Sequence, residues 1–284
     1  MWPVRVLHVS DLHAGTVEEP EVEHALRTLA AELEPELVVA TGDLTHRNHD
    51  AQHERSGALL RSLGRPLVVI PGNHDIPMLP PGRFTSTFKA FLRVWPETEP
   101  EYRSERVVVC GLNSVRPWKQ QGGALRHSQI ERAAAVFRDA PNTALRIAAV
   151  HHHLLGAPWR TAKRTIANRS TVLGGLVGAG AEVILSGHVH QSAVEERREF
   201  EVVRPGERIH GATVITGPGL GQPRPKRRGE ARGLNLIEAT GRTIRVVTYV
   251  WTPGEKPGGA WQAIADRRYP RGIEPLERIS AEEG

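Results

Sequence analysis

The sequence contains a single cysteine, Cys110, in a chain of 284 residues. One cysteine cannot close a disulfide within the chain, so a disulfide-stabilised secreted scaffold is excluded. A zinc site built from several thiolates is excluded for the same reason. The chain does contain 14 histidines. Any metal site must therefore be built from imidazole nitrogen and from oxygen.

Long apolar runs are also missing from the chain. No uninterrupted stretch approaches the roughly 18 residues of a membrane span, and no apolar segment of signal-peptide length precedes Asp11. Hydrophobic residues make up 39% of the chain and charged residues 24%, so there is enough apolar material for a folded core. We therefore expect a soluble, cytoplasmic protein that does not associate with membranes.

Short runs rich in β-branched residues alternate with amphipathic segments, and Pro20 suits the first turn of one of these predicted helices. Repeated strand–helix units favour an α/β fold with parallel strands. The predicted strands cover residues 4–9, 37–40, 67–70, 107–110, 145–150 and 183–185, and the predicted helices cover 21–33, 51–63, 128–137 and 165–177.

The pattern changes after Ser192, where strand-like runs are separated by Gly and Pro. These runs cover residues 194–203, 212–216, 234–239 and 243–250, and they predict a mainly antiparallel completion of a sheet. The last segment, residues 252–284, is rich in Pro, Gly and charge and has weak periodicity. We predict one domain over residues 1–251, with residues 252–284 as a peripheral tail packed on it.

Polar side chains follow five of the predicted strands. The motifs are, in chain order, Ser10-Asp11-Leu12-His13, Gly42-Asp43, Gly72-Asn73-His74-Asp75, His151-His152-His153 and Gly187-His188-Val189-His190. Ligands of open α/β sheets bind at the carboxyl ends of the parallel strands, so these groups should converge from distant parts of the chain.

The spacing inside the motifs supports the same site. In Asp11-x-His13 and His188-x-His190, a separation of two residues puts both side chains on one side of an extended backbone, where they can hold one centre. The glycines that open three of the motifs allow a sharp exit from the strand and a close approach of the backbone to an anionic ligand.

The five motifs in this order resemble the signature of the calcineurin-like metallophosphoesterase superfamily, from about residue 4 to residue 192. The resemblance implies a four-layer α-β-β-α sandwich of two mixed sheets, with a dinuclear metal site at the carboxyl ends of the strands. It also implies a ligand set of Asp11, His13, Asp43 and His190 for one metal and Asp43, Asn73, His151 and His188 for the other, with Asp43 bridging.

The same resemblance gives His74 the role of general acid toward the leaving-group oxygen, without a bond to metal. Two cations about 3.5–4 Å apart would polarise the phosphoryl oxygens and lower the pKa of a bridging water, whose hydroxide attacks phosphorus. A ligand set of imidazole, carboxylate and one amide suits two divalent ions of Mn, Fe or Zn better than Mg or Ca.

The roles of three residues stay open between two alternatives each. His151 is favoured as the ligand because the family uses the first histidine after the strand, with His152 as the alternative. His46 and Asn113 are candidate substrate-binding residues, against a role in loop hydrogen bonding. His46 also occupies a position where the protein-phosphatase branch of the superfamily has an aspartate. This difference argues against a protein phosphatase.

The leading functional hypothesis is a phosphodiesterase for small phosphodiesters, similar to the bacterial cyclic-nucleotide branch. The segment Gly111-Leu112-Asn113-Ser114 is among the residues that resemble that branch. The alternatives are a DNA repair-type nuclease, a phosphomonoesterase or protein phosphatase, and, less favoured, a non-catalytic scaffold member.

The positive charge of the chain does not decide between these hypotheses. The net charge is +5, and the run 224–228 reads Arg-Pro-Lys-Arg-Arg, which is suited to a phosphate backbone or to a solvated loop. Arginine outnumbers lysine throughout the chain, so we favour a small phosphoester over nucleic acid as the partner.

Overall fold

The computed structural model describes residues 3–16, 20–119, 121–159, 163–198, 208–209, 211–221, 230–254, 260–271 and 274–275. Its helices are α1 (Pro20–Leu33), α2 (Asp50–Arg61), α3 (Gly82–Thr85), α4 (Lys89–Val94), α5 (His127–Arg138) and α6 (Arg169–Gly178). Its strands are β1 (Val4–Val9), β2 (Leu37–Ala40), β3 (Leu67–Val69), β4 (Glu101–Arg103), β5 (Val107–Leu112), β6 (Leu145–Val150), β7 (Val183–Ser186), β8 (Ala193–Arg198), β9 (Arg208–Ile209), β10 (Gly211–Thr216), β11 (Gly233–Ala239), β12 (Thr243–Thr252), β13 (Ala260–Pro270) and β14 (Glu274–Pro275).

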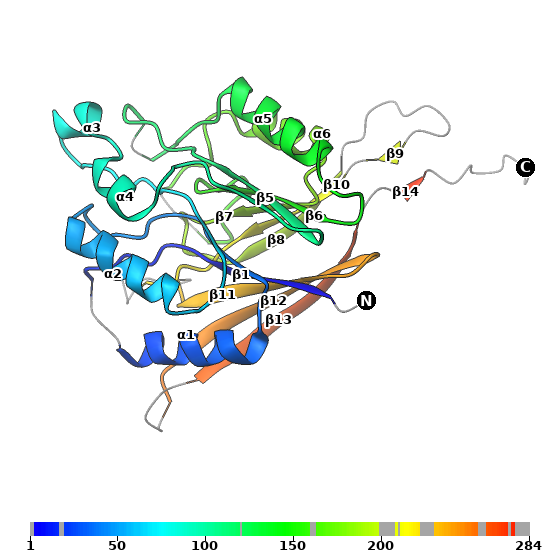
Figure 1. Ribbon diagram of the computed structural model, residues 1–284, viewed down its shortest axis with the longest axis horizontal. Coiled ribbons are helices and arrows are strands. Elements are labelled where there is room, and N and C mark those ends of the chain that lie inside the picture. Colours follow the sequence, from blue (N-terminus) through cyan, green and yellow to red (C-terminus); the bar gives the residue numbers. More distant parts are fainter. Residues whose placement is uncertain are drawn as a thin grey trace, which may run out of the picture.

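Two six-stranded sheets form the centre of the molecule (Figure 1). The first has the order β13-β12-β11-β1-β2-β3, with β1, β2 and β3 parallel and β11 to β13 antiparallel. The second has the order β4-β5-β6-β7-β10-β8, with parallel pairing from β5 to β10 and antiparallel strands at both edges. Both sheets are therefore mixed, as predicted.

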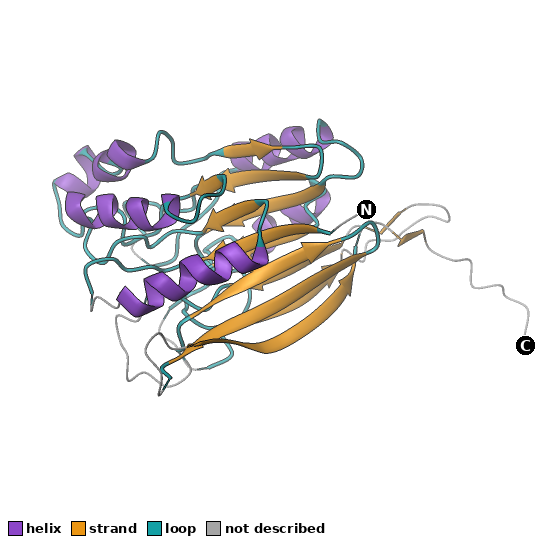
Figure 2. Cartoon of the chain, turned by 60° about the horizontal axis from the view of Figure 1, so that its bottom comes forward, coloured by secondary structure: helices purple, strands orange, loops and turns teal. Residues whose placement is uncertain are grey.

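Three apolar clusters define four layers. One cluster lies between the sheets, a second packs α1, α2 and α4 on the outer face of the first sheet, and a third packs α5 and α6 on the second. Figure 2 shows the helices on the outside of the strands. Strands such as β2 and β7 are buried at every residue, because a sheet covered on both faces needs apolar side chains on both. The α-β-β-α sandwich is confirmed.

Helix α1 illustrates how the sequence pattern produces this packing. Pro20 begins the helix, and Glu21 and Glu23 lie in its first turn, where negative charge complements the helix dipole. The buried residues Val22 and Leu26 share the face that packs on the first sheet.

The strands after Ser192 pair mainly antiparallel, as predicted, and β10 also pairs in parallel with β7. Strand β4 was not predicted, nor was β13, which pairs along β12 inside the segment expected to be a tail. Most β13 side chains are exposed at this sheet edge, and Arg245 of β12 bonds both carboxylate oxygens of Asp266. An edge strand with so few buried positions leaves almost no apolar periodicity in the sequence.

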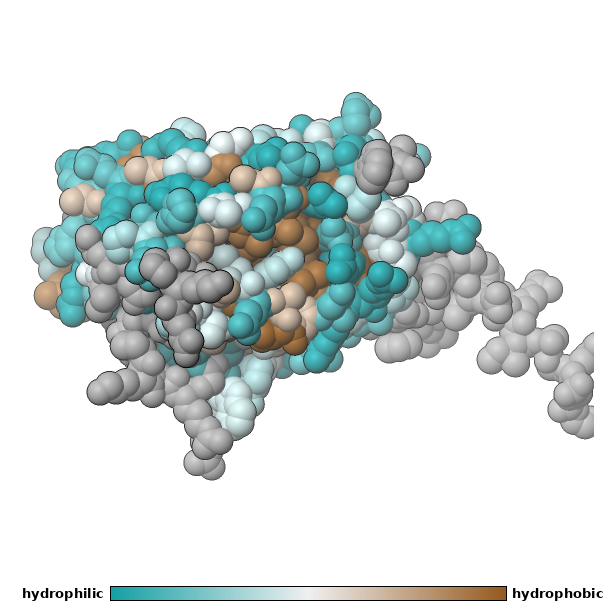
Figure 3. Space-filling view, turned by 90° about the horizontal axis from the view of Figure 1, so that it is seen from below, coloured by the Kyte–Doolittle hydropathy of each residue, from teal (hydrophilic) through white to brown (hydrophobic). Residues whose placement is uncertain are grey.

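The side of the molecule that carries α1 and β13 exposes part of its apolar surface. Figure 3 views this side from below, and apolar residues gather near its centre. The rings of Trp251 and Trp261 lie 5.4 Å apart at their centroids, and Trp261 is only partly buried against the same core cluster as α1. Helix α1 therefore covers the first sheet incompletely.

No helix in the described part of the chain is long and apolar enough to cross a membrane. The cellular compartment and the division of the chain at residue 251 stay predictions.

Candidate metal centre

The predicted motifs all lie on loops that leave the carboxyl ends of five parallel strands. Strands β1, β2 and β3 belong to the first sheet, and β6 and β7 belong to the second. The loops from the two sheets meet because the strands of both layers end on the same side of the sandwich. Side chains more than 170 residues apart in the sequence are thereby brought into hydrogen-bond distance.

Four buried side chains form the first cluster: Asp11, His13, Asp43 and His190. Nε2 of His13 lies 3.0 Å from Nε2 of His190, which lies 3.1 Å from Oδ1 of Asp11. The other oxygen of Asp11, Oδ2, accepts hydrogen bonds from Ser10 Oγ and from the backbone N–H of His188. Oδ1 of Asp11 has no hydrogen-bond partner among the described residues. The four side chains therefore offer ligand atoms that lie within 4.8 Å of one another.

The second cluster contains Asp43 again, together with His151 and His188, all buried. Nε2 of His151 lies 3.3 Å from Oδ1 of Asp43 and 3.1 Å from Oδ1 of Asn73. Within the described residues, neither ring nitrogen of His188 has a hydrogen-bond partner. Asp43 belongs to both clusters, so the structure brings together all seven residues predicted as ligands.

The structure also separates the adjacent histidines. Nδ1 of His151 donates a hydrogen bond of 2.7 Å to the carbonyl of Thr41, which turns Nε2 toward Asp43. The ring of His152 is held instead by a 2.8 Å hydrogen bond between Nδ1 and Ser114 Oγ, and His152 is in neither cluster. This geometry favours His151 over His152 as the ligand.

The backbone at the site corrects one part of the sequence argument. Five of the predicted ligands have left-handed φ angles: Asp11 (53°), His13 (48°), Asp43 (50°), His188 (74°) and His190 (58°). Their spacing had suggested an extended backbone for Asp11-x-His13 and His188-x-His190. The observed angles show that these motifs are not extended. Such angles are uncommon outside glycine and cost energy, and they gather where the surrounding structure enforces them.

The motif glycines were expected to let the backbone approach an anionic ligand, but in the structure they lie where neighbouring loops contact each other. A Cβ added to Gly72 would overlap the backbone nitrogen of Asp43, and one added to Gly187 would overlap Ser10 Oγ. The glycines thus allow neighbouring loops to touch each other. No approach of their backbone to an anionic ligand is needed to explain them.

Most of the pKa shifts at the site favour the forms that bind metal. Burial would raise the pKa of Asp43, but the nearby rings of His151 and His74 hold it well below its usual range. Burial lowers the pKa of His13 and His188 well below the ordinary value, despite the nearby carboxylates. Burial would also lower the pKa of His151, but the nearby carboxylate of Asp43 raises it to about 9, so metal binding at this ring would release a proton. Ionised carboxylates and neutral imidazoles are the forms that coordinate metal. Two clusters of such atoms, joined by Asp43, fit two divalent ions.

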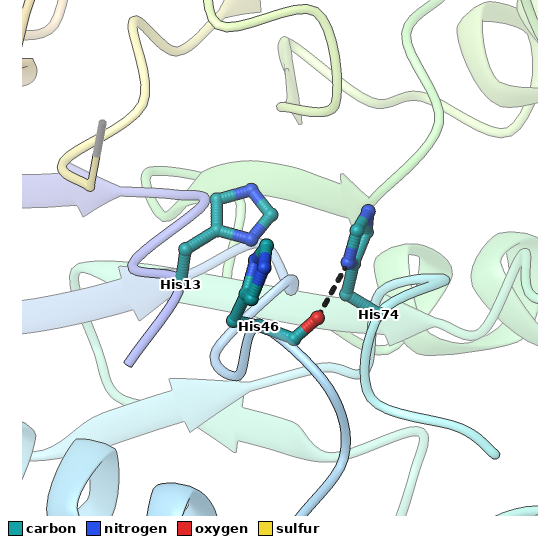
Figure 4. Close-up of side chains that lie close together, drawn as sticks. All are labelled: His13, His46 and His74. Atoms are coloured by element: carbon teal, nitrogen blue, oxygen red, sulfur yellow. Dashed lines mark hydrogen bonds between the residues drawn. The ribbon is translucent and has the colours of Figure 1, made fainter. Parts of the chain in front are cut away.

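His74 lies beside these clusters and is half-buried. Its ring centroid is 4.8 Å from that of His13, and its backbone N–H donates a 2.8 Å hydrogen bond to Oδ1 of Asp43. Nδ1 of His74 donates a 2.9 Å hydrogen bond to the carbonyl of His46, drawn as a dashed line in Figure 4. Ring nitrogens of His13, His46 and His74 lie within 4.8 Å of one another.

A small pocket opens next to His74, with a volume of ≈ 130 Å³. His46 lines it, and its role in substrate binding stays a prediction. Asn113 is in neither the pocket nor the clusters. Its Oδ1 accepts a hydrogen bond from the backbone N–H of Val115, so its observed role is in the loop.

Sequence reasoning missed three contacts that support the site. The carboxylate of Asp75 accepts hydrogen bonds from the backbone N–H groups of Leu44, Thr45 and Gly72 and from the Thr45 hydroxyl, which ties two motif loops together. Asp75 closes one of the five sequence motifs, but its residue type alone gave it no role.

The other two contacts left no signal in the sequence. Lys163 Nζ donates a hydrogen bond to the carbonyl of His188. The carboxylate of Glu230 lies 3.7 Å from Nδ1 of His190. Neither residue belongs to a recognisable motif, and the basic run 224–228 just before Glu230 lies outside the described residues.

Known structures share this fold. A purple acid phosphatase from yellow lupin (Lupinus luteus) seeds has a TM-score of 0.67 at 12% identity, over 94% of this chain and 53% of that chain. A structure of PhoD has a TM-score of 0.64 at 14% identity, over 100% and 73%. A dimetal phosphatase from Danio rerio has a TM-score of 0.60 at 14% identity, over 96% and 100%. The chain spans about half the length of the lupin protein.

No curated protein sequence matches the chain. A family model described as calcineurin-like phosphoesterase matches residues 4–192, which include every predicted metal ligand. This match covers more than half of the chain. Together with two buried clusters of carboxylates and imidazoles, it establishes that the chain belongs to the calcineurin-like phosphoesterase family and is a metal-dependent phosphoester hydrolase.

Proposed function

We propose that the protein is a phosphodiesterase for small phosphodiesters such as cyclic nucleotides. The observation that carries this proposal is the position of His74, which lies between the two ligand clusters and a pocket. A diester carries two organic substituents where a monoester carries one, and the pocket offers room for part of the second on the far side of His74.

The two clusters of side chains would each hold one divalent ion. Asp11, His13, Asp43 and His190 would hold one divalent ion. Asp43, Asn73, His151 and His188 would hold the other. Ions bound there supply Lewis acidity toward the phosphoryl oxygens and make a water molecule more acidic.

The contribution of His74 follows from its hydrogen bonds. Because Nδ1 donates to the carbonyl of His46, Nε2 is the nitrogen left for the substrate. In hydrolysis, the oxygen of water forms a bond to phosphorus, and the bond from phosphorus to the leaving oxygen breaks. A proton on Nε2 of His74 passes to that oxygen, so the alcohol leaves uncharged.

A substrate panel tests the proposal. The protein would be incubated with bis(p-nitrophenyl) phosphate, p-nitrophenyl phosphate and cyclic AMP, separately with Mn, Fe, Zn and Mg. We expect hydrolysis of the diesters to exceed that of the monoester with at least one of Mn, Fe or Zn. A metal-loaded protein that cleaves only the monoester would refute the diesterase proposal and support a phosphomonoesterase.

A further inference from the structure

The pocket next to His74 contains a buried arginine that the proposed mechanism does not use. Arg83 lies in α3 and lines this pocket together with His46, Asn73 and His74. Only 6% of Arg83 is exposed. Arginine is rarely buried to this extent unless its charge has a partner.

The hydrogen bonds of Arg83 leave its charge uncompensated. Nε donates to the carbonyl of Pro117, and Nη1 donates to the carbonyl of Pro77 at 3.1 Å. Both acceptors are neutral. Among the described residues, Nη2 has no hydrogen-bond partner and no carboxylate forms an ion pair with the guanidinium. An anion in the pocket that Arg83 lines would therefore supply a countercharge to the buried guanidinium.

The rest of the pocket suits such an anion. Its described lining contains no carboxylate and adds a second cation, Arg47, and the amide of Gln121. Its volume of ≈ 130 Å³ is well below the roughly 300–1,000 Å³ of a pocket for a drug-sized ligand. A single phosphate group fits this size better than a nucleoside does.

Apolar side chains near the pocket provide a surface for the organic part of a substrate. Met78, which lines the pocket, is 52% exposed. Trp118 is 63% exposed and follows Pro117, whose carbonyl accepts the hydrogen bond from Arg83. A base or sugar can therefore lie outside while a phosphate enters.

We propose that Arg83 binds a second phosphate group of the substrate, so the enzyme prefers phosphodiesters that carry a phosphate beyond the scissile one. This inference rests on the proposed phosphodiesterase function. The second phosphate takes no part in the chemistry and stays attached to its product.

Binding of two product-like nucleotides tests the role of Arg83 without relying on activity. The metal-loaded protein would be titrated calorimetrically with thymidine 5′-monophosphate and with thymidine 3′,5′-bisphosphate. We expect the bisphosphate to bind at least about tenfold more tightly, since hydrogen bonds to charged groups contribute about 1.5–3 kcal/mol and 1.4 kcal/mol is tenfold. In Arg83→Gln this preference should disappear.

Arg93→Gln is the matched control, because it removes the same charge from an exposed arginine of α4 that pairs with Asp50 and does not line the pocket. The control should keep the preference. If Arg83→Gln does not fold, Arg83→Lys replaces it. Lysine lacks the planar fork that can bond two carbonyls and an anion together, so the preference should weaken.

Two results would overturn the inference. One is equal affinity of the wild-type protein for the two nucleotides. The other is an unchanged preference in a folded Arg83→Gln protein, which would leave Arg83 with a purely structural role. Failure to cleave bis(p-nitrophenyl) phosphate would instead contradict the proposed phosphodiesterase function. The binding comparison does not depend on turnover, so the two failures can be distinguished.

Discussion

The backbone N–H of His74 donates a hydrogen bond of 2.8 Å to Oδ1 of Asp43. The candidate acid is thereby fixed to the one carboxylate shared by both ligand clusters. The same oxygen lies 3.3 Å from Nε2 of His151. A single aspartate therefore sets the spacing of the two clusters and the position of His74.

Asp43→Asn should reduce bound metal more than any other single ligand change. The amide oxygen can still accept the His74 hydrogen bond, but the negative charge that both clusters share is lost. We expect at most one metal equivalent per chain after dialysis, measured by elemental analysis, against two for the wild type. Asp50→Asn, at an exposed position on α2, is the control. Retention of two equivalents in Asp43→Asn would contradict the bridging role.

His74→Asn should lower kcat according to the leaving group. Loss of general-acid catalysis costs roughly 10²–10⁴-fold, and the ribose oxygen of cyclic AMP needs that proton. The p-nitrophenolate ion is stable without a proton, so the loss on bis(p-nitrophenyl) phosphate should be much smaller. Metal content should stay at the wild-type level. Equal losses on both substrates would show that His74 does not protonate the leaving group.

His151→Ala and His152→Ala should separate metal binding from stability. His151→Ala should lose one metal equivalent, because its Nε2 lies in the second cluster. His152→Ala should keep both equivalents and lose about 1–3 kcal/mol in the free energy of unfolding, because the buried Ser114 hydroxyl loses its bond to the ring and keeps only the backbone N–H of residue 152. Metal analysis and urea unfolding measure the two effects. The opposite pattern of metal loss would make His152 the ligand.

Cys110 should be unreactive toward thiol reagents in the folded protein. Burial raises the pKa of its thiol to about 11, and the thiolate is the reactive form. At pH 8 we expect no labelling in buffer and one labelled thiol per chain in denaturant.

The same shift predicts a pH dependence of stability. Below about pH 8.5 the thiol is neutral in both folded and unfolded chains, so it contributes no pH dependence. As the pH rises from there toward 11, only the unfolded chain ionises, and the free energy of unfolding should fall. Cys110→Ala should lack this part of the decline in urea unfolding measured across that range.

Local patterns in the sequence were sufficient to predict most of the strands and the longer helices, whereas the four-layer arrangement was implied by the family resemblance. The apolar run at residues 37–40 and the helical spacing at 21–33 each predicted an element that the structure contains, because burial on one or both faces imposes a period that composition reveals. Strand β13 escaped prediction because an exposed edge strand needs few apolar side chains.

The types and the order of the motif residues also predicted the chemistry of the site. With one cysteine and many histidines, a site of imidazole and oxygen was the only kind of metal site available. Only the tertiary structure decided how those residues meet. The left-handed backbone at Asp11 and His188, the hydrogen bond that turns His151 toward Asp43, and the burial of Arg83 beside His74 all depend on contacts between segments distant in the chain. No local pattern encodes such contacts, because they arise when the ends of two sheets meet.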